Sequence, residues 1–146
     1  VKNEGFTPIF VPDTDSCWTW AKELEHFIVF IEPCWNLGLR MAIYEQAFMN
    51  FFYSNGTSAI GSLNKKIRQI AMMPVIEDSI HFEADVVNSF GLDNGQRRYN
   101  FAEKHQFLSW KQDTFKNIRD EFLEFVDTVQ PFEKSGNLDK GVTSCE

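Results

Sequence analysis

The sequence has little of the chemistry that builds metal centres or disulfide frameworks. It holds three cysteines in 146 residues, an odd number, and no Cys-x-x-Cys pair occurs. Its three histidines, His26, His81 and His105, are far apart, and none has a second histidine four residues away. Zinc sites and disulfide-rich scaffolds depend on such spacings. We therefore expect reduced thiols and no bound metal.

Several catalytic signatures are missing as well. The sequence contains no Gly-x-Ser-x-Gly elbow and no glycine-rich phosphate loop, and no cysteine lies in a basic or glycine-rich context. These features mark serine hydrolases, nucleotide-binding folds and thiol enzymes. Their absence argues against those classes, and we expect no cofactor.

Long hydrophobic runs are also absent. No stretch of about 18 uncharged apolar residues, the length needed to span a membrane, occurs. Residues 1–5 lack the basic-then-apolar layout of a signal peptide. We expect a cytoplasmic protein without membrane contact. The net charge of −7 opposes non-specific binding to nucleic acid, but a local basic patch outweighs the net charge within a Debye length of about 10 Å.

The chain is rich in large apolar side chains, which include 15 Phe and 4 Trp. They recur every three or four residues, a spacing typical of helices. This spacing predicts helices over about 16–31, 34–53, 63–72, 76–90, 97–110 and 113–130. We therefore predict an all-α fold, a single-domain bundle of five or six helices over residues 1–132, irregular in 1–14 and followed by a flexible tail, 133–146. The alternative is a short strand pair formed by residues 6–11 and 27–31.

The last predicted helix is the clearest. Its apolar face holds Phe115, Ile118, Phe122, Phe125 and Val129, and its acidic face holds Asp113, Asp120, Glu121, Glu124 and Asp127. An acidic face of this kind speeds the encounter with a basic protein partner. It is also the ordinary solvated side of an amphipathic helix.

The remaining segment of interest is 96–105, Gln-Arg-Arg-Tyr-Asn-Phe-Ala-Glu-Lys-His. Arg98 is followed by six residues and then by His105, directly before the clearest helix. This pattern resembles the catalytic signature of the HEPN superfamily, small all-helical domains found in toxin–antitoxin and phage-defence systems. The resemblance covers about residues 16–130. It departs from the family pattern at Asn100, which lies two residues after Arg98 and not next to it.

The resemblance implies a metal-independent endoribonuclease that acts as a homodimer, with the 34–53 helix as the dimer surface. Arg98 would hold phosphate, His105 would transfer a proton and Asn100 would orient one of them. Further RNA contacts would come from Arg97, Lys104 and Lys111.

Three alternatives remain open at this point. The basic residues of 97–105 can be a solvated helix face above a buried Phe101 and Leu108. The protein can be a small acidic inhibitor (an immunity protein, an antitoxin or a phage anti-defence protein) that binds a partner with a basic surface. It can also be a HEPN-like domain that dimerises or binds without catalysis.

Overall fold

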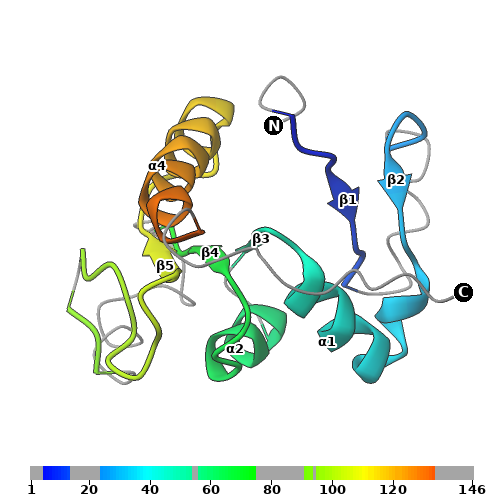
Figure 1. The fold of residues 1–146 in the computed structure, drawn as a ribbon, viewed down its shortest axis with the longest axis horizontal. Coiled ribbons are helices and arrows are strands. Elements are labelled where there is room, and N and C mark those ends of the chain that lie inside the picture. The colour runs from blue at the N-terminus through cyan, green and yellow to red at the C-terminus, as the bar shows by residue number, and fades with distance from the viewer. Residues whose placement is uncertain (1–4, 14–23, 54–55, 75–90, 94, 134–146) are drawn as a thin grey trace, which may run out of the picture.

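The computed structural model of the chain describes residues 5–13, 24–53, 56–74, 91–93 and 95–133. Within these residues the fold is mixed α/β, with two small parallel sheets and the helices α1, α2 and α4 (Figure 1). The predicted all-α bundle is therefore wrong. No helix in this part of the chain is long and apolar enough to cross a membrane.

The larger sheet forms the centre of the fold. Its three parallel strands, in spatial order, are β3 (Asn50–Tyr53), β4 (Gln69–Met72) and β5 (Gln106–Ser109). The helix α2 (Gly56–Leu63) connects β3 to β4 and packs on one face of the sheet, and α4 (Phe115–Glu133) covers the other (Figure 1). The strands are in register, so their amino ends lie at the same edge of the sheet.

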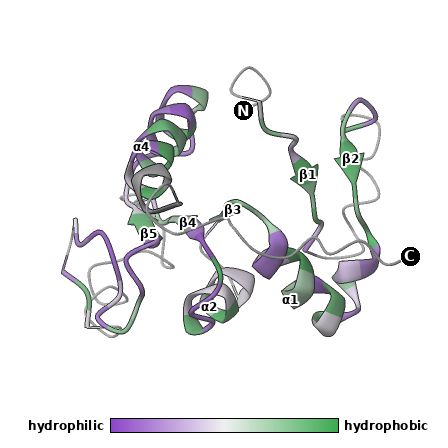
Figure 2. Ribbon diagram, in the orientation of Figure 1, coloured by the Kyte–Doolittle hydropathy of each residue, from purple (hydrophilic) through white to green (hydrophobic). Residues whose placement is uncertain are grey.

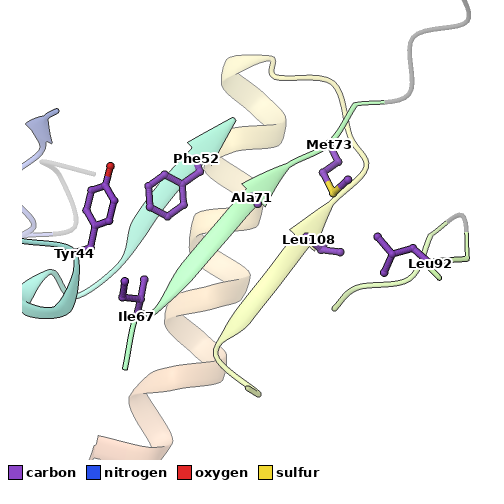
Figure 3. Packing of buried hydrophobic residues seen from close by; sticks show 7 residues of the cluster. All are labelled: Tyr44, Phe52, Ile67, Ala71, Met73, Leu92 and Leu108. Carbon is purple, nitrogen blue, oxygen red and sulfur yellow. The ribbon is translucent and has the colours of Figure 1, made fainter. Parts of the chain in front are cut away.

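The central strand β4 is buried along its whole length. Ile70 and Met72 pack with Phe125 of α4 on one face. Ala71 points to the opposite face, where it packs with Leu108 and with the other members of that core (Figure 3). A strand covered on both faces is mostly apolar and lacks the alternation of a half-exposed strand. The exception in β4 is Gln69, whose buried amide donates to Ser62 Oγ at 2.7 Å.

The predicted helix over 34–53 is wrong in its second half, since α1 (Leu37–Gln46) is followed by β3. Asn36 caps α1, because its Oδ1 accepts a hydrogen bond from the backbone N–H of Leu39 at 2.9 Å. The backbone becomes extended at Ala47. The helical dimer surface expected there does not exist as one helix, and a homodimer stays a prediction.

Two further helical predictions are also wrong. Residues 63–72 contain the end of α2 and the strand β4, and residues 97–110 contain a loop and the strand β5. Short apolar runs fit both helical and strand periods, so spacing alone does not separate the two. The predicted helix over 76–90 lies outside the described residues.

The amino-terminal part holds the second sheet. Strand β1 (Ile9–Phe10) pairs in parallel with β2 (Ile28–Val29), which confirms the alternative of a strand pair in 6–11 and 27–31. Residues 24–31 are therefore not helical, and 14–23 lie outside the described residues. Both strands are hydrophobic (Figure 2).

A buried arginine joins this sheet to α1. A 3-10 turn, η3 (Glu32–Cys34), precedes the helix. The guanidinium of Arg40 donates to the carbonyl oxygens of Pro33 at 2.8 Å and of Pro12 at 2.9 Å. It also donates to Asp13 Oδ1 at 3.1 Å. The positive charge is therefore fully occupied by structural contacts.

The last predicted helix is confirmed as α4, which carries both hydrophobic and hydrophilic residues along its length (Figure 2). Its cap is Thr114, whose Oγ1 accepts a hydrogen bond from the backbone N–H of Asn117 at 3.3 Å. Phe122, Phe125 and Val129 are buried, whereas Phe115 is 83% exposed, contrary to its predicted place on the apolar face. Apart from Glu133, the end of α4, the predicted tail 133–146 lies outside the described residues.

Candidate functional site

A pocket of about 420 Å³ opens at the amino ends of β4 and β5, beside the last turns of α4. Its lining side chains come from three separate segments of the chain: Arg68, Arg98, Lys104, His105, Phe107, Thr128 and Val129. None of these described lining residues is acidic. The volume falls in the range of about 300–1,000 Å³ that is typical of small-ligand sites. The pocket therefore has the size and the charge to hold an anion.

Arg68 and His105 are neighbours because of the register of the sheet. Each directly precedes a strand, and the first residues of those strands, Gln69 and Gln106, are paired. The backbone N–H of Gln69 donates to the carbonyl of His105 at 3.1 Å. The backbone N–H of Asn50 donates to the carbonyl of Arg68 at 2.8 Å. Main-chain hydrogen bonds thus hold the two residues at one edge of the sheet.

The half-buried ring of His105 has a defined tautomer. Its Nε2 lies 2.9 Å from the carbonyl oxygen of Lys65. A carbonyl oxygen can only accept, so Nε2 must carry the hydrogen, and in the neutral ring Nδ1 holds the lone pair. Two hydrogen bonds fix the loop around Lys65. Gln106 Nε2 donates to the carbonyl of Asn64 at 2.9 Å and to the carbonyl of Ile67 at 3.2 Å. The ring is therefore oriented with Nδ1 as its proton acceptor.

Arg98 lies on an ordered loop beside β5. The N–H of Leu108 donates to the carbonyl of Arg97 at 2.8 Å. The side-chain amide of Gln96 donates to the carbonyl of Arg98 at 2.6 Å and to Asn100 Oδ1 at 3.0 Å. The Arg98 residue is exposed, and no ion pair of its guanidinium occurs among the described residues. The loop backbone is thus fixed while the charged group faces solvent at the pocket.

Asn100 takes part in this loop network and does not line the pocket. Besides its contact with Gln96, its Nδ2 lies 3.5 Å from the carbonyl oxygen of Gly91. The structure therefore brings Arg98, Lys104 and His105 together but leaves Asn100 outside that group. A role of Asn100 in orienting either residue stays a prediction.

Arg97 and Lys111 belong to a second cluster, built around Glu121. The carboxylate of Glu121 is completely buried. Arg97 Nη1 lies 3.0 Å from Oε1 and 2.9 Å from Oε2, and Lys111 Nζ lies 2.9 Å from Oε1. Burial raises the pKa of Glu121, but the hydrogen bonds from Lys111 and Arg97 outweigh it, and the pKa lies below its ordinary value. An RNA contact by Arg97 or Lys111 stays a prediction.

The predicted acidic face of α4 is correspondingly reduced. Glu121 was expected to face solvent and is buried, so that expectation is wrong. Glu124 lies 2.8 Å from Arg97 Nη2, and Asp120 lies 3.2 Å from Lys116 Nζ. A protein partner with a basic surface would meet a face whose carboxylates are partly paired. The inhibitor hypothesis stays a prediction.

Sequence reasoning missed Arg68 as a site residue, because residues 63–72 were predicted to be a helix and the strand β4 was not foreseen. One signal in the sequence was available. Arg68 and His105 each directly precede a four-residue segment that begins with glutamine and continues with two apolar residues. No group of three or more His, Cys, Asp or Glu that could hold a metal ion occurs within the described parts of the chain.

The comparisons with known proteins add no assignment. The chain matches no protein-family model, no curated protein and no solved structure. HEPN domains are all-helical, so the parallel sheet contradicts the architecture on which that resemblance depended. The all-helical fold that the HEPN resemblance implied is therefore wrong, and no family match supports a toxin–antitoxin or defence protein.

Proposed function

We propose that the protein binds a phosphate-bearing ligand in the pocket, with Arg98 as the main anion contact and His105 as the proton-transfer group. One observation carries the proposal. Arg98, Lys104 and His105 line the same pocket, and the sheet register adds Arg68 from a distant part of the sequence. A phosphate bound there would be attracted by the positive charges of these side chains.

The cationic lining of the pocket contrasts with the acidic character of the whole chain. The net charge is −7, yet none of the described lining residues of the pocket is acidic. Salt screens charges that are more than about 10 Å away, so the side chains at the pocket act on a ligand there more strongly than the net charge of the chain does. A guanidinium binds phosphate oxygens through two parallel hydrogen bonds, which suits the exposed side chain of Arg98.

RNA is the ligand on which these groups could also do chemistry. His105 Nδ1 would accept the proton of a ribose 2′-hydroxyl, and the 2′ oxygen would form a bond to phosphorus. The bond from phosphorus to the 5′ oxygen would break, and that oxygen would take a proton from solvent. Arg98 would stabilise the negative charge that develops on the phosphoryl oxygens. The products would be a 2′,3′-cyclic phosphate and a 5′-hydroxyl.

Calorimetric titration of the full chain with inorganic pyrophosphate tests the binding step. Arg98→Ala should weaken binding at least about tenfold, since a charge-assisted bidentate contact contributes more than about 1.4 kcal/mol. Arg119→Ala is the matched control, because it removes the same charge from an exposed position on α4 outside the pocket. It should change the affinity less than about twofold.

Absence of pyrophosphate binding, or equal losses in the two variants, would overturn the proposal. The circular dichroism of each variant must match that of the wild type, so that a loss of binding is not a loss of fold. RNA cleavage is a separate readout: His105→Ala should abolish it while binding of pyrophosphate is kept within a few-fold.

A further inference from the structure

The loop that carries Arg98 also presents an aromatic platform. The rings of Tyr99 and Phe101 are stacked, with centroids 5.2 Å apart and an angle of 8° between their planes. Tyr99 is half-buried, packs against the core and places its hydroxyl 3.9 Å from Met73 Sδ. Phe101 is 58% exposed. The inner ring is thus anchored, and one face of the outer ring is covered by its neighbour.

The exposure of Phe101 has no explanation in the packing of the described core. The solvated-helix alternative expected this ring to be buried, and it is not. Because Tyr99 covers one face, the exposed area of Phe101 includes its opposite face, which leaves a flat apolar surface open to solvent. A planar ring system is the ligand group that completes such a stack.

The platform lies close to the cationic pocket along the chain. Phe101 follows Arg98 by three residues and precedes Lys104 by three. Three residues span at most about 10 Å, which is about the length of three stacked nucleotides at roughly 3.4 Å each. Tyr99 packs on the core face opposite to that of Phe107 and Val129 in the pocket, so a bound strand would pass over the loop between Arg98 and Phe101. A strand of a few nucleotides is long enough for that path.

We propose that Phe101 stacks on an unpaired base of a single-stranded nucleic acid whose phosphate occupies the pocket; this inference rests on the proposed function. Proteins that bind single strands combine a positively charged groove with exposed aromatic rings, and every base has a face that can stack. The bases of a duplex are already stacked on each other, so a duplex cannot use this platform. The ligand class is single-stranded, and the stacking itself does not depend on base identity.

Fluorescence anisotropy with a labelled ten-residue oligouridylate, read on the full chain at fixed salt, tests the inference. Phe101→Leu keeps an apolar side chain and removes the aromatic face, and it should weaken binding about five- to a hundredfold. Phe101→Trp should bind at least as tightly as the wild type. Phe115→Leu is the matched control, because Phe115 is a still more exposed ring on α4, and it should leave the affinity unchanged.

Pyrophosphate separates this inference from the proposed function. Phe101→Leu should leave the affinity for pyrophosphate unchanged, whereas Arg98→Ala should weaken both ligands. Equal pyrophosphate affinities for the wild type and Arg98→Ala would overturn the proposed function. Equal oligouridylate affinities for the wild type and Phe101→Leu defeat the stacking inference, even if pyrophosphate binds as expected. Binding of a ten-base-pair duplex as tight as that of the single strand also overturns it.

Discussion

Replacing Glu121 and replacing Arg97 break the same ion pair, yet we expect different losses in the free energy of unfolding. Glu121→Gln leaves two cations, Arg97 and Lys111, whose side chains are 37% and 47% exposed and can be hydrated. Its loss should be about 1–2 kcal/mol, in the range for a lost hydrogen bond to a charged group. Arg97→Met leaves a carboxylate with 0% exposure and only Lys111 to neutralise it. It also removes the exposed pair with Glu124, which contributes less than about 1 kcal/mol. Its loss should be about 3 kcal/mol, the lower end of the range for a broken buried pair.

Urea denaturation at neutral pH, followed by circular dichroism, measures both losses. The double variant, Glu121→Gln with Arg97→Met, should be less destabilised than the sum of the two single variants, because the buried carboxylate is then absent and Lys111 is the one cation left in the cluster. Lys116→Met is the control, since its pair with Asp120 is exposed and contributes less than about 0.5 kcal/mol. A larger loss for Glu121→Gln than for Arg97→Met would refute the reasoning.

Acidification provides an independent test of the same cluster. The folded-state pKa of Glu121 lies below its ordinary value of 4.5, so the folded state binds this proton less readily than the unfolded state. The stabilisation is therefore complete above about pH 4.5 and is lost as the pH falls through the folded-state pKa. Glu121→Gln cannot titrate, and its free energy of unfolding should fall less than that of the wild type between about pH 5 and pH 3. Parallel pH profiles would contradict this assignment.

Three further outcomes follow from the packing. Gly61→Ala should destabilise the protein by about 1–3 kcal/mol, because the added Cβ would clash with Gln69 Oε1 and lie 3.0 Å from Phe52 Cε2. In Gly38→Ala, in α1, the added Cβ meets only an ordinary contact at 3.5 Å, and the protein should be stabilised by up to about 1 kcal/mol. Urea titrations in which the two variants change the free energy of unfolding in the same direction would contradict this. Burial raises the pKa of Tyr99 above 10.0, so stability should be complete below about pH 10 and decline above it, and Tyr99→Phe should flatten that decline in an alkaline titration.

The strands show why the helical prediction failed. Phe48 and Phe52 are four residues apart and fit one face of a helix, but in the structure they pack in different cores on either side of the sheet. The four residues of β4 are all buried, so they show no alternation that could reveal a strand. The helix α4 was predictable because its apolar and charged positions alternate with a clear helical period over a long stretch.

The candidate site was predictable only where the chemistry is local in sequence. Arg98, Lys104 and His105 lie within eight consecutive residues, and they line one pocket. Arg68 joins them through strand register, which a single sequence does not reveal. The prediction that Glu121 faces solvent failed for the same reason, because its partners Arg97 and Lys111 come from outside its helix. A carboxylate on an amphipathic helix is normally solvated, and only the tertiary contacts show otherwise.

The pocket lies at an unusual edge of the parallel sheet. Open α/β sheets usually bind ligands at the carboxyl ends of their strands. This pocket lies at the amino ends of β4 and β5. The phosphate proposal therefore depends on the side chains that line the pocket and takes no support from the general behaviour of parallel sheets.

Nitrogen NMR of the histidine rings tests the central claim most directly. In the free protein, the spectrum of His105 should show the tautomer with hydrogen on Nε2, because that nitrogen donates to the carbonyl of Lys65. On titration with pyrophosphate, the ring signals of His105 should shift and saturate, and in Arg98→Ala the same shift should need at least about tenfold more pyrophosphate. The exposed His26, which lies beside Glu25, should not respond. A His105 ring that carries its hydrogen on Nδ1, or that ignores pyrophosphate, would contradict the account.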